Sequence, residues 1–104
     1  MIAIVKDNLN KIIELCERMQ LQSLYLFGSA TKEKGYTKDS DLDFLYQFKK
    51  GDKGMPLSKY DYFDLMFDLE KITGKSIDLV AVEKIKNKFF LSRINREKIK
   101  IYES

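Results

Sequence analysis

Histidine is absent from the sequence of 104 residues, and cysteine occurs once. The lack of histidine excludes Ser-His triads, Cys-His dyads and zinc sites built on histidine. The single Cys16 has no partner for an internal disulfide, and its place on an apolar helical stripe indicates a packed, inert thiol. Any chemistry must therefore depend on carboxylates, hydroxyls, lysines or arginines.

Long apolar segments are missing as well. No run approaches the roughly 18 apolar residues that span a bilayer, and the N-terminus becomes acidic too early, at Asp7, for a secretory signal. We therefore expect a cytoplasmic protein that does not bind membranes. A hydrophobic fraction of 44% is typical of an ordinary globular protein, and we expect one domain over residues 1–104.

The charge is only mildly basic. There are 19 basic and 16 acidic residues, mixed along the chain, and the net charge is +3. This balance is compatible with anionic ligands, but it does not indicate a nucleic-acid-binding protein.

Apolar periodicity predicts helices and strands in alternation. In chain order we expect a helix over 7–20, a strand over 24–27, a turn and loop over 30–39, a strand over 41–48, a helix over 58–73, a strand over 77–82, a helix over 83–95 and a strand over 99–102. Asp7 or Asn8 is expected to cap the first helix, Ser58 to cap the second, and Gly74 to end it. This order predicts an α/β (α+β) fold, with a small mixed sheet of about four strands and helices mainly on one face.

Two aspartates open the strand over 41–48. Asp41 and Asp43 lie at i and i+2, so both side chains point to one face, about 6–7 Å apart along the backbone. Their oxygens can converge on a hard cation such as Mg²⁺, which prefers oxygen ligands. The alternative is that the pair merely lines a solvated strand end.

A third aspartate, Asp78, interrupts the apolar strand over 77–82. We expect its carboxylate to require a partner there, because desolvation of an unpaired charge is unfavourable. A salt bridge to a lysine is one solution. If the strand instead neighbours that of Asp41 and Asp43, the three carboxylates repel one another, and a bound metal resolves the repulsion.

Gly28 and Ser29 directly follow the predicted strand over 24–27. A glycine at a strand end allows the backbone to approach a phosphate closely. The following amides, at a helical N-terminus, and the Ser29 hydroxyl can donate to that anion. An ordinary tight turn is the alternative for an isolated Gly-Ser pair.

Together these segments carry a family resemblance. Leu26-Phe27-Gly28-Ser29-Ala30, Ser40-Asp41-Leu42-Asp43-Phe44-Leu45 and Ile77-Asp78-Leu79-Val80 resemble the motifs of the minimal nucleotidyltransferases, within the DNA polymerase beta-like nucleotidyltransferase superfamily. The similarity covers nearly the whole chain. It implies the nucleotidyltransferase fold and an enzyme that moves a nucleoside monophosphate.

The resemblance also implies roles for single residues. Asp41, Asp43 and Asp78 would be the catalytic residues and would coordinate two Mg²⁺ ions, while Gly28, Ser29, Lys32 and Ser40 would bind the nucleotide, with ATP as substrate. Many relatives carry arginines after the Gly-Ser pair. This sequence has Ala30, Thr31, Lys32 and Glu33 instead, and a lysine supplies a point charge without the bidentate fork of arginine.

The resemblance further indicates an acceptor. Small prokaryotic nucleotidyltransferases of this kind act as antitoxins, which transfer AMP to a tyrosine of a HEPN-domain toxin. A hetero-oligomer with such a toxin, or a homo-oligomer, is compatible with the sequence. Two aromatic groups could form the partner surface or fill the core; they comprise Tyr60, Tyr62, Phe63 and Phe67, and Phe89 with Phe90. A basic run is expected to coat a solvated helix face, and a contact for an acidic partner or RNA is the alternative; it comprises Lys84, Lys86, Lys88, Arg93 and Arg96.

Two other functions stay open at this point. The chain could neutralise a toxin by binding alone, without catalysis. It could also be a basic nucleic-acid-binding domain, which we do not expect because that function leaves Asp78 unexplained.

Overall fold

The computed structural model describes residues 1–32 and 34–104. Eight regular elements and two short 3₁₀ helices follow in chain order: α1 (Ala3–Asp7), α2 (Leu9–Arg18), β1 (Leu21–Phe27), η1 (Gly28–Thr31), β2 (Leu42–Phe48), α3 (Tyr62–Thr73), β3 (Ile77–Ala81), η2 (Val82–Lys84), α4 (Lys88–Glu97) and β4 (Ile99–Glu103). The predicted alternation of helices and strands is confirmed.

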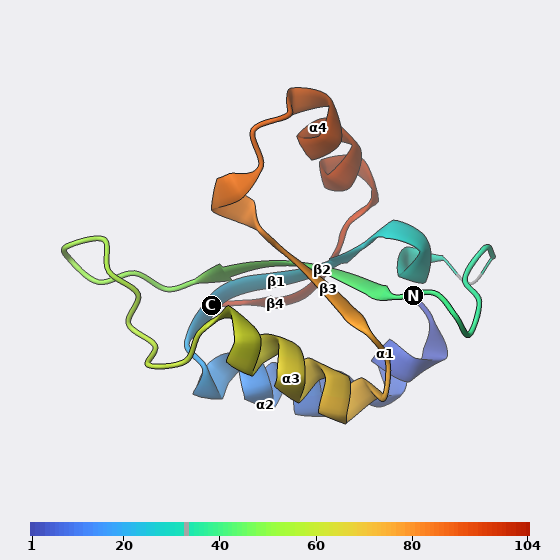
Figure 1. The fold of residues 1–104 in the computed structure, drawn as a ribbon, viewed down its shortest axis with the longest axis horizontal. Helices are drawn as coiled ribbons and strands as arrows, with labels where there is room; N and C mark the ends of the chain where they lie inside the picture. Colours follow the sequence, from blue (N-terminus) through green and yellow to red (C-terminus); the bar gives the residue numbers. More distant parts are fainter. Residues whose placement is uncertain (33) are drawn as a thin grey trace.

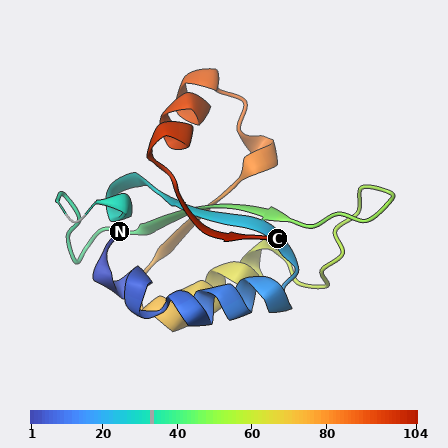
Figure 2. The same cartoon turned by 180° about the vertical axis from the view of Figure 1, so that it is seen from behind.

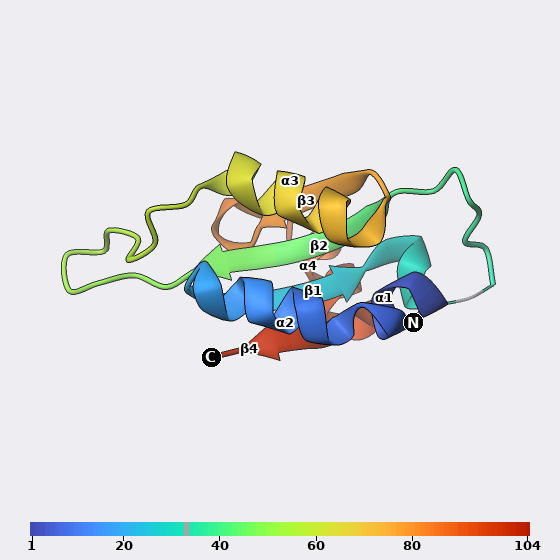
Figure 3. The same cartoon turned by 90° about the horizontal axis from the view of Figure 1, so that it is seen from below.

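The four strands form one mixed sheet in the order β3-β2-β1-β4. β1 is antiparallel to both β2 and β4, whereas β2 and β3 are parallel. Helices α1, α2 and α3 cover one face of the sheet, and α4 stands on the other (Figure 1 and Figure 3). The α+β fold with a four-stranded mixed sheet and helices mainly on one face is therefore confirmed.

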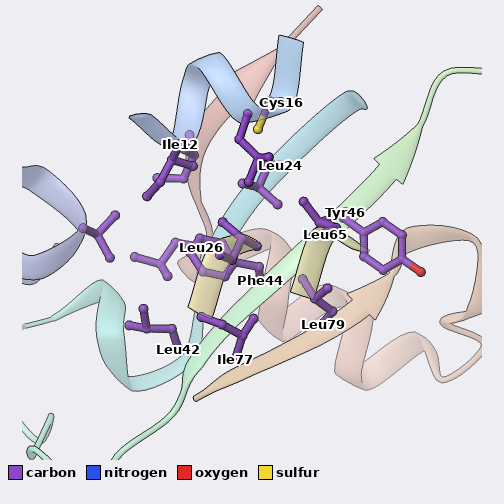
Figure 4. Packing of buried hydrophobic residues seen from close by; sticks show 14 of the residues in the cluster. Ile12, Cys16, Leu24, Leu26, Leu42, Phe44, Tyr46, Leu65, Ile77 and Leu79 are labelled. Carbon is purple, nitrogen blue, oxygen red and sulfur yellow. The ribbon is translucent and has the colours of Figure 1, made fainter. Parts of the chain in front are cut away.

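The core has a larger and a smaller part. The larger cluster joins the sheet to α2 and α3; Figure 4 shows side chains of this cluster, among them Ile12, Leu26, Phe44 and Leu65. The smaller cluster lies under α4 and contains Phe27, Leu45 and Ile94. Because successive side chains of a strand alternate between faces, Asp43 lies on the same face of β2 as Leu45, the face of α4.

The predicted helix over 7–20 corresponds to α2, and a separate short helix, α1, precedes it. The chain breaks at Asn8, whose side-chain amide donates to the carbonyl of Ile4 at 2.8 Å. Asn8 is the N-cap residue of α2, but its side chain makes no capping hydrogen bond. The short α1 therefore precedes the helix that the periodicity predicted, and its Val5 is fully buried in the core.

The predicted cap at Ser58 is wrong. Helix α3 begins at Tyr62, and Asp61 caps it by accepting from the amides of Phe63 and Asp64 at 3.0 and 3.1 Å. Asp64 accepts in return from the amide of Asp61 at 2.9 Å, which completes a capping box. Ser58 instead accepts from the amide of Tyr60. Gly74 ends the helix as predicted, in the left-handed conformation with φ of 68°.

The last predicted helix, over 83–95, starts later than expected. The short η2 follows β3, and α4 begins only at Lys88, where Asn87 accepts from the amides of Phe89 and Phe90 at 2.9 and 3.1 Å. In the part of the chain that the structure describes, no helix combines the length and apolarity needed to cross a membrane.

Candidate active site

Two of the three aspartates are direct neighbours. In the parallel pair of β2 and β3, Asp43 is the register partner of Asp78. Both side chains lie on the sheet face that also carries α4, because register partners in a ladder share a face. The chain thus places two carboxylates from distant segments side by side.

The environment of Asp43 shows how closely these groups interact. The pKa of Asp43 is raised from 3.8 to about 6. Partial burial is the largest cause, followed by the charge of Asp78, a hydrogen bond that the protonated Asp43 donates to Asp78, and the charge of Asp41. Each of these causes disfavours the negatively charged form of Asp43.

Asp41 lies just before β2 and is exposed. The backbone there is fixed, because the amide of Leu42 donates to the carbonyl of Ser76 at 3.0 Å, next to the start of β3. Asp41 is near enough to raise the pKa of Asp43 by its charge. Among the described residues, however, no three carboxylate, cysteine or histidine side chains are gathered closely enough to hold a metal ion.

Asp78 is exposed, and this corrects one premise of the sequence argument. The strand around Asp78 is apolar in sequence. However, β3 is an edge strand of the sheet, and the Asp78 side chain is open to solvent. Desolvation therefore does not force a partner on Asp78. Within the described residues, no lysine or arginine forms a salt bridge with it.

Gly28 lies against the Asp43 carboxylate. Its φ is +74°, and a Cβ added to it would lie 2.3 Å from Oδ2 of Asp43. Only glycine fits this close approach. Thr31 holds the turn by donating from Oγ1 to the carbonyl of Gly28 at 2.7 Å. The N-terminus lies beside η1 (Figure 2), and the terminal ammonium of Met1 donates to the Thr31 carbonyl at 2.8 Å, which supports the turn as well.

The other predicted nucleotide-binding residues lie in η1, directly after η1, and in the loop before β2. Ser29 is an exposed residue of η1, and Lys32 follows η1 directly and is exposed. Ser40 belongs to the loop before β2, where its Oγ accepts from the Thr37 amide at 3.2 Å and lies 3.2 Å from Oγ1 of Thr37. Glu33, named with the residues after the Gly-Ser pair, lies outside the described residues.

Comparisons with known proteins agree with this arrangement. The sequence profile of the family described as Polymerase beta, Nucleotidyltransferase matches residues 10–104. The chain belongs to this family. A Methanocaldococcus jannaschii protein named protein adenylyltransferase MJ1379 is 31% identical over 85 residues, which cover 82% of this chain and 81% of the relative. The chain is therefore a nucleotidyltransferase.

Solved structures share the nucleotidyltransferase fold. One, described as a minimal nucleotidyltransferase, has a TM-score of 0.69 at 25% sequence identity. The match covers 91% of this chain and 90% of the chain in that structure. A toxin–antitoxin crystal structure with AMP-PNP has a TM-score of 0.65 at 22% identity, covering 93% and 74%. A structure of a tri-AMPylated Shewanella oneidensis HEPN toxin in complex with an MNT antitoxin has a TM-score of 0.59 at 20% sequence identity. The match covers 95% of this chain and 72% of the chain in that structure.

The aromatic groups are divided between core and surface. Phe63, Phe67 and Phe89 are exposed by 59%, 61% and 88%, so they do not fill the core of this nucleotidyltransferase. Tyr60 and Tyr62 pack partly against the larger cluster. The expected basic run is exposed throughout, as a solvated surface requires.

Sequence reasoning missed two residues next to the Gly28 turn of the nucleotidyltransferase. Thr31 was seen only as a replacement for an arginine, although a threonine three residues after the turn glycine can donate to its carbonyl. Arg93 was seen only as part of a solvated basic run, yet it lines a cavity together with Gly28. No local pattern indicates that contact, since it depends on how α4 packs on the sheet.

Proposed function

We propose that the chain is a metal-dependent adenylyltransferase that transfers AMP from ATP to a hydroxyl, that of a tyrosine, on a partner HEPN-domain toxin, and so acts as its antitoxin. The observation that carries the proposal is the Asp43–Asp78 register pair beside the Gly28 turn. Support for the chemistry comes from the protein adenylyltransferase relative. Support for the partner comes from the fold shared with antitoxins of HEPN toxins.

The donor chemistry suits magnesium, although the three carboxylates would have to move closer together around an ion. Asp41, Asp43 and Asp78 offer hard carboxylate oxygens. Burial, and then the charges of Asp78 and Asp41, raise the pKa of Asp43, and a cation would compensate those charges. These three side chains would hold the ions. When bound, two Mg²⁺ supply electrostatic stabilisation of the attacking and leaving oxygens in an in-line displacement.

The residues of the chain then have separate tasks. Gly28 and Ser29 would bind the phosphates beyond the α-phosphorus, with Lys32 and Ser40 nearby. The acceptor oxygen forms a bond to the α-phosphorus of ATP, and the bond to the leaving pyrophosphate breaks. Asp78 is open to solvent on an edge strand, so an incoming hydroxyl can reach it, and its carboxylate would take the hydroxyl proton.

The direct test is transfer of label from α-labelled ATP to the purified partner toxin. Wild type is expected to label the toxin only when Mg²⁺ is present, and Asp41→Asn and Asp43→Asn to reduce labelling by at least about 100-fold. Asp68→Asn is the matched control, because Asp68 pairs with Arg18 away from the site. Equal labelling by Asp43→Asn and wild type would overturn the proposal.

Neutralisation by binding alone is the second candidate. The exposed Phe63 and Phe67, one turn apart on α3, favour it because large apolar side chains in solvent are common at protein interfaces. In that case the aspartate variants still protect cells from the toxin, whereas Phe63→Ser with Phe67→Ser abolishes protection. Under the catalytic proposal the aspartate variants lose protection.

A further inference from the structure

A cavity of about 190 Å³ lies between the Gly28 turn and α4. Its wall combines two aromatic rings, one aliphatic side chain, one cation and one carboxylate; these residues are Phe27, Gly28, Phe90, Arg93, Ile94 and Glu97. The rings of Phe27 and Phe90 pack edge to face, with centroids 6.3 Å apart. The lining therefore combines two buried apolar residues, Phe27 and Ile94, with the exposed Phe90 and the charged Arg93 and Glu97.

Arg93 is the cation of this cavity, and it is available for a ligand. The side chain is exposed, and it forms no ion pair with any carboxylate that the structure describes, although Glu97 lies one helical turn away. An arginine offers a planar fork of donors that matches the oxygens of a phosphate group. The next residue of the helix, Ile94, is buried in the smaller cluster with Phe27 and Leu45, and this packing holds α4 in place.

The position of the cavity beside the Gly28 turn indicates which part of a bound nucleotide the cavity would face. Gly28 lines the cavity and also lies against the Asp43 carboxylate, so the Gly28 turn adjoins both the cavity and the aspartates. Under the proposed function the α-phosphorus reacts at the aspartates and the remaining phosphates extend over Gly28. The group that continues past Gly28 reaches the side of the turn on which Arg93 lies.

Resting on the proposed function, we propose that Arg93 of α4 binds the leaving pyrophosphate portion of the nucleoside triphosphate. Arg93 thus supplies a bidentate fork from a helix 60 residues downstream of the turn, where Ala30 and Thr31 offer no charge. Glu97 in the same cavity opposes an anion. The carboxylate therefore limits the affinity for pyrophosphate.

The experiment is calorimetric titration of the full chain with magnesium pyrophosphate, and separately with adenosine. Arg93→Ala is expected to weaken pyrophosphate binding about tenfold, the loss of one charge-assisted contact, and to leave adenosine binding unchanged. Arg93→Lys recovers only part of the loss. Glu97→Gln is expected to tighten pyrophosphate binding about twofold by removing a like charge.

Arg96→Ala is the matched control, because Arg96 is an exposed arginine of the same helix that does not line the cavity. Equal pyrophosphate affinity in Arg93→Ala and Arg96→Ala overturns the proposal. So does a loss of adenosine rather than pyrophosphate binding in Arg93→Ala or Glu97→Gln, which assigns the cavity to the nucleobase. Retained melting temperatures show that each variant is folded.

The proposal fails separately from the function it rests on. Pyrophosphate binding requires neither a toxin nor a transfer step, so a chain that binds pyrophosphate through Arg93 but labels no toxin contradicts the proposed acceptor alone. In steady-state transfer, Arg93→Ala is expected to raise the KM for ATP and lower kcat, because the contact forms with bound ATP and strengthens as negative charge develops on the leaving pyrophosphate.

Discussion

Gly28 and Asp43 approach each other so closely that a Cβ on Gly28 would lie 2.3 Å from the Asp43 carboxylate oxygen. The turn that follows β1 and the first half of β2 are thereby fixed against each other. A phosphate on the Gly28 side and a cation on the Asp43 side would share this point. The contact joins the two halves of the candidate site, and no local sequence pattern requires it.

Gly28→Ala tests this contact. The positive φ alone costs about 1–2 kcal/mol for a residue with a Cβ, and the collision with Asp43 adds to it. Gly35→Ala is the control, since its φ is also positive but nothing lies within 4 Å of an added Cβ. We expect urea unfolding to show a larger loss in Gly28→Ala than in Gly35→Ala.

The double variant Gly28→Ala with Asp43→Ala separates collision from strain. The free energy of unfolding of the double variant should be higher than the sum of the two single changes predicts, because the second substitution removes the atoms that the new Cβ meets. Strictly additive changes would contradict the contact.

Asp43→Asn is expected to stabilise the metal-free protein. The pKa of Asp43 is raised to about 6 by burial and then by the neighbouring carboxylates. A raised carboxyl pKa means that stability present below about pH 4 is lost as pH rises through about 6. Asparagine carries no charge and escapes this loss.

Melting in EDTA checks that expectation. The variant should melt several degrees above wild type at pH 7.5, at roughly 4–8 °C per kcal/mol for a chain of this size, and the gap should narrow at pH 4.5. A variant that melts below wild type at pH 7.5 contradicts the repulsion. Asp68→Asn, which removes the exposed pair with Arg18, should change little.

Asp61→Ala is expected to destabilise the protein by about 1 kcal/mol through loss of the α3 cap. Ser58→Ala, at the position the sequence favoured, should stay within about 0.5 kcal/mol of wild type. Urea unfolding of both variants measures the difference. Equal losses of stability in the two variants would contradict the assignment of Asp61, rather than Ser58, as the cap of α3.

The Cys16 thiol is expected to be chemically inert in the folded protein. It is also expected to make the free energy of unfolding depend on pH in the alkaline range. Burial raises its pKa from 9.0 to about 12. Below pH 9 the thiol is neutral in both states, so its full contribution is present. Between pH 9 and 12 only the unfolded thiol ionises, and stability falls by about 1.4 kcal/mol per pH unit.

Two measurements follow for Cys16. A thiol reagent at pH 8 should not react with the native protein but should react after unfolding in guanidinium. Cys16→Ala should show a shallower loss of stability between pH 9 and 11 than wild type does. Rapid reaction of the native thiol would contradict the burial.

Much of this fold is readable from the sequence because periodicity is local. The alternation of residues 41–48 and the apolar stretch at 77–82 predicted β2 and β3, and Gly74 predicted the end of α3. Ser58 was misplaced as a cap because serine and aspartate are both good N-cap residues, and the capping box with Asp64 decides between them.

The site was less completely predictable. Asp43 and Asp78 were expected near each other only if their strands paired, and the parallel register supplies that pairing. The exposure of Asp78 depends on β3 being an edge strand, which no residue near it reveals. Arg93 reaches the Gly28 cavity through the packing of α4, a long-range contact without a sequence signal.

Cation binding by the aspartates is the claim that all the chemistry requires. Its most direct test is the electron paramagnetic resonance signal of Mn²⁺, titrated with the full chain in the presence of a non-hydrolysable ATP analogue. Wild type and Asp68→Asn should bind the ion, whereas Asp43→Asn and Asp78→Asn should leave it free in solution at the same concentrations. Undiminished Mn²⁺ binding by both Asp43→Asn and Asp78→Asn would contradict the assignment.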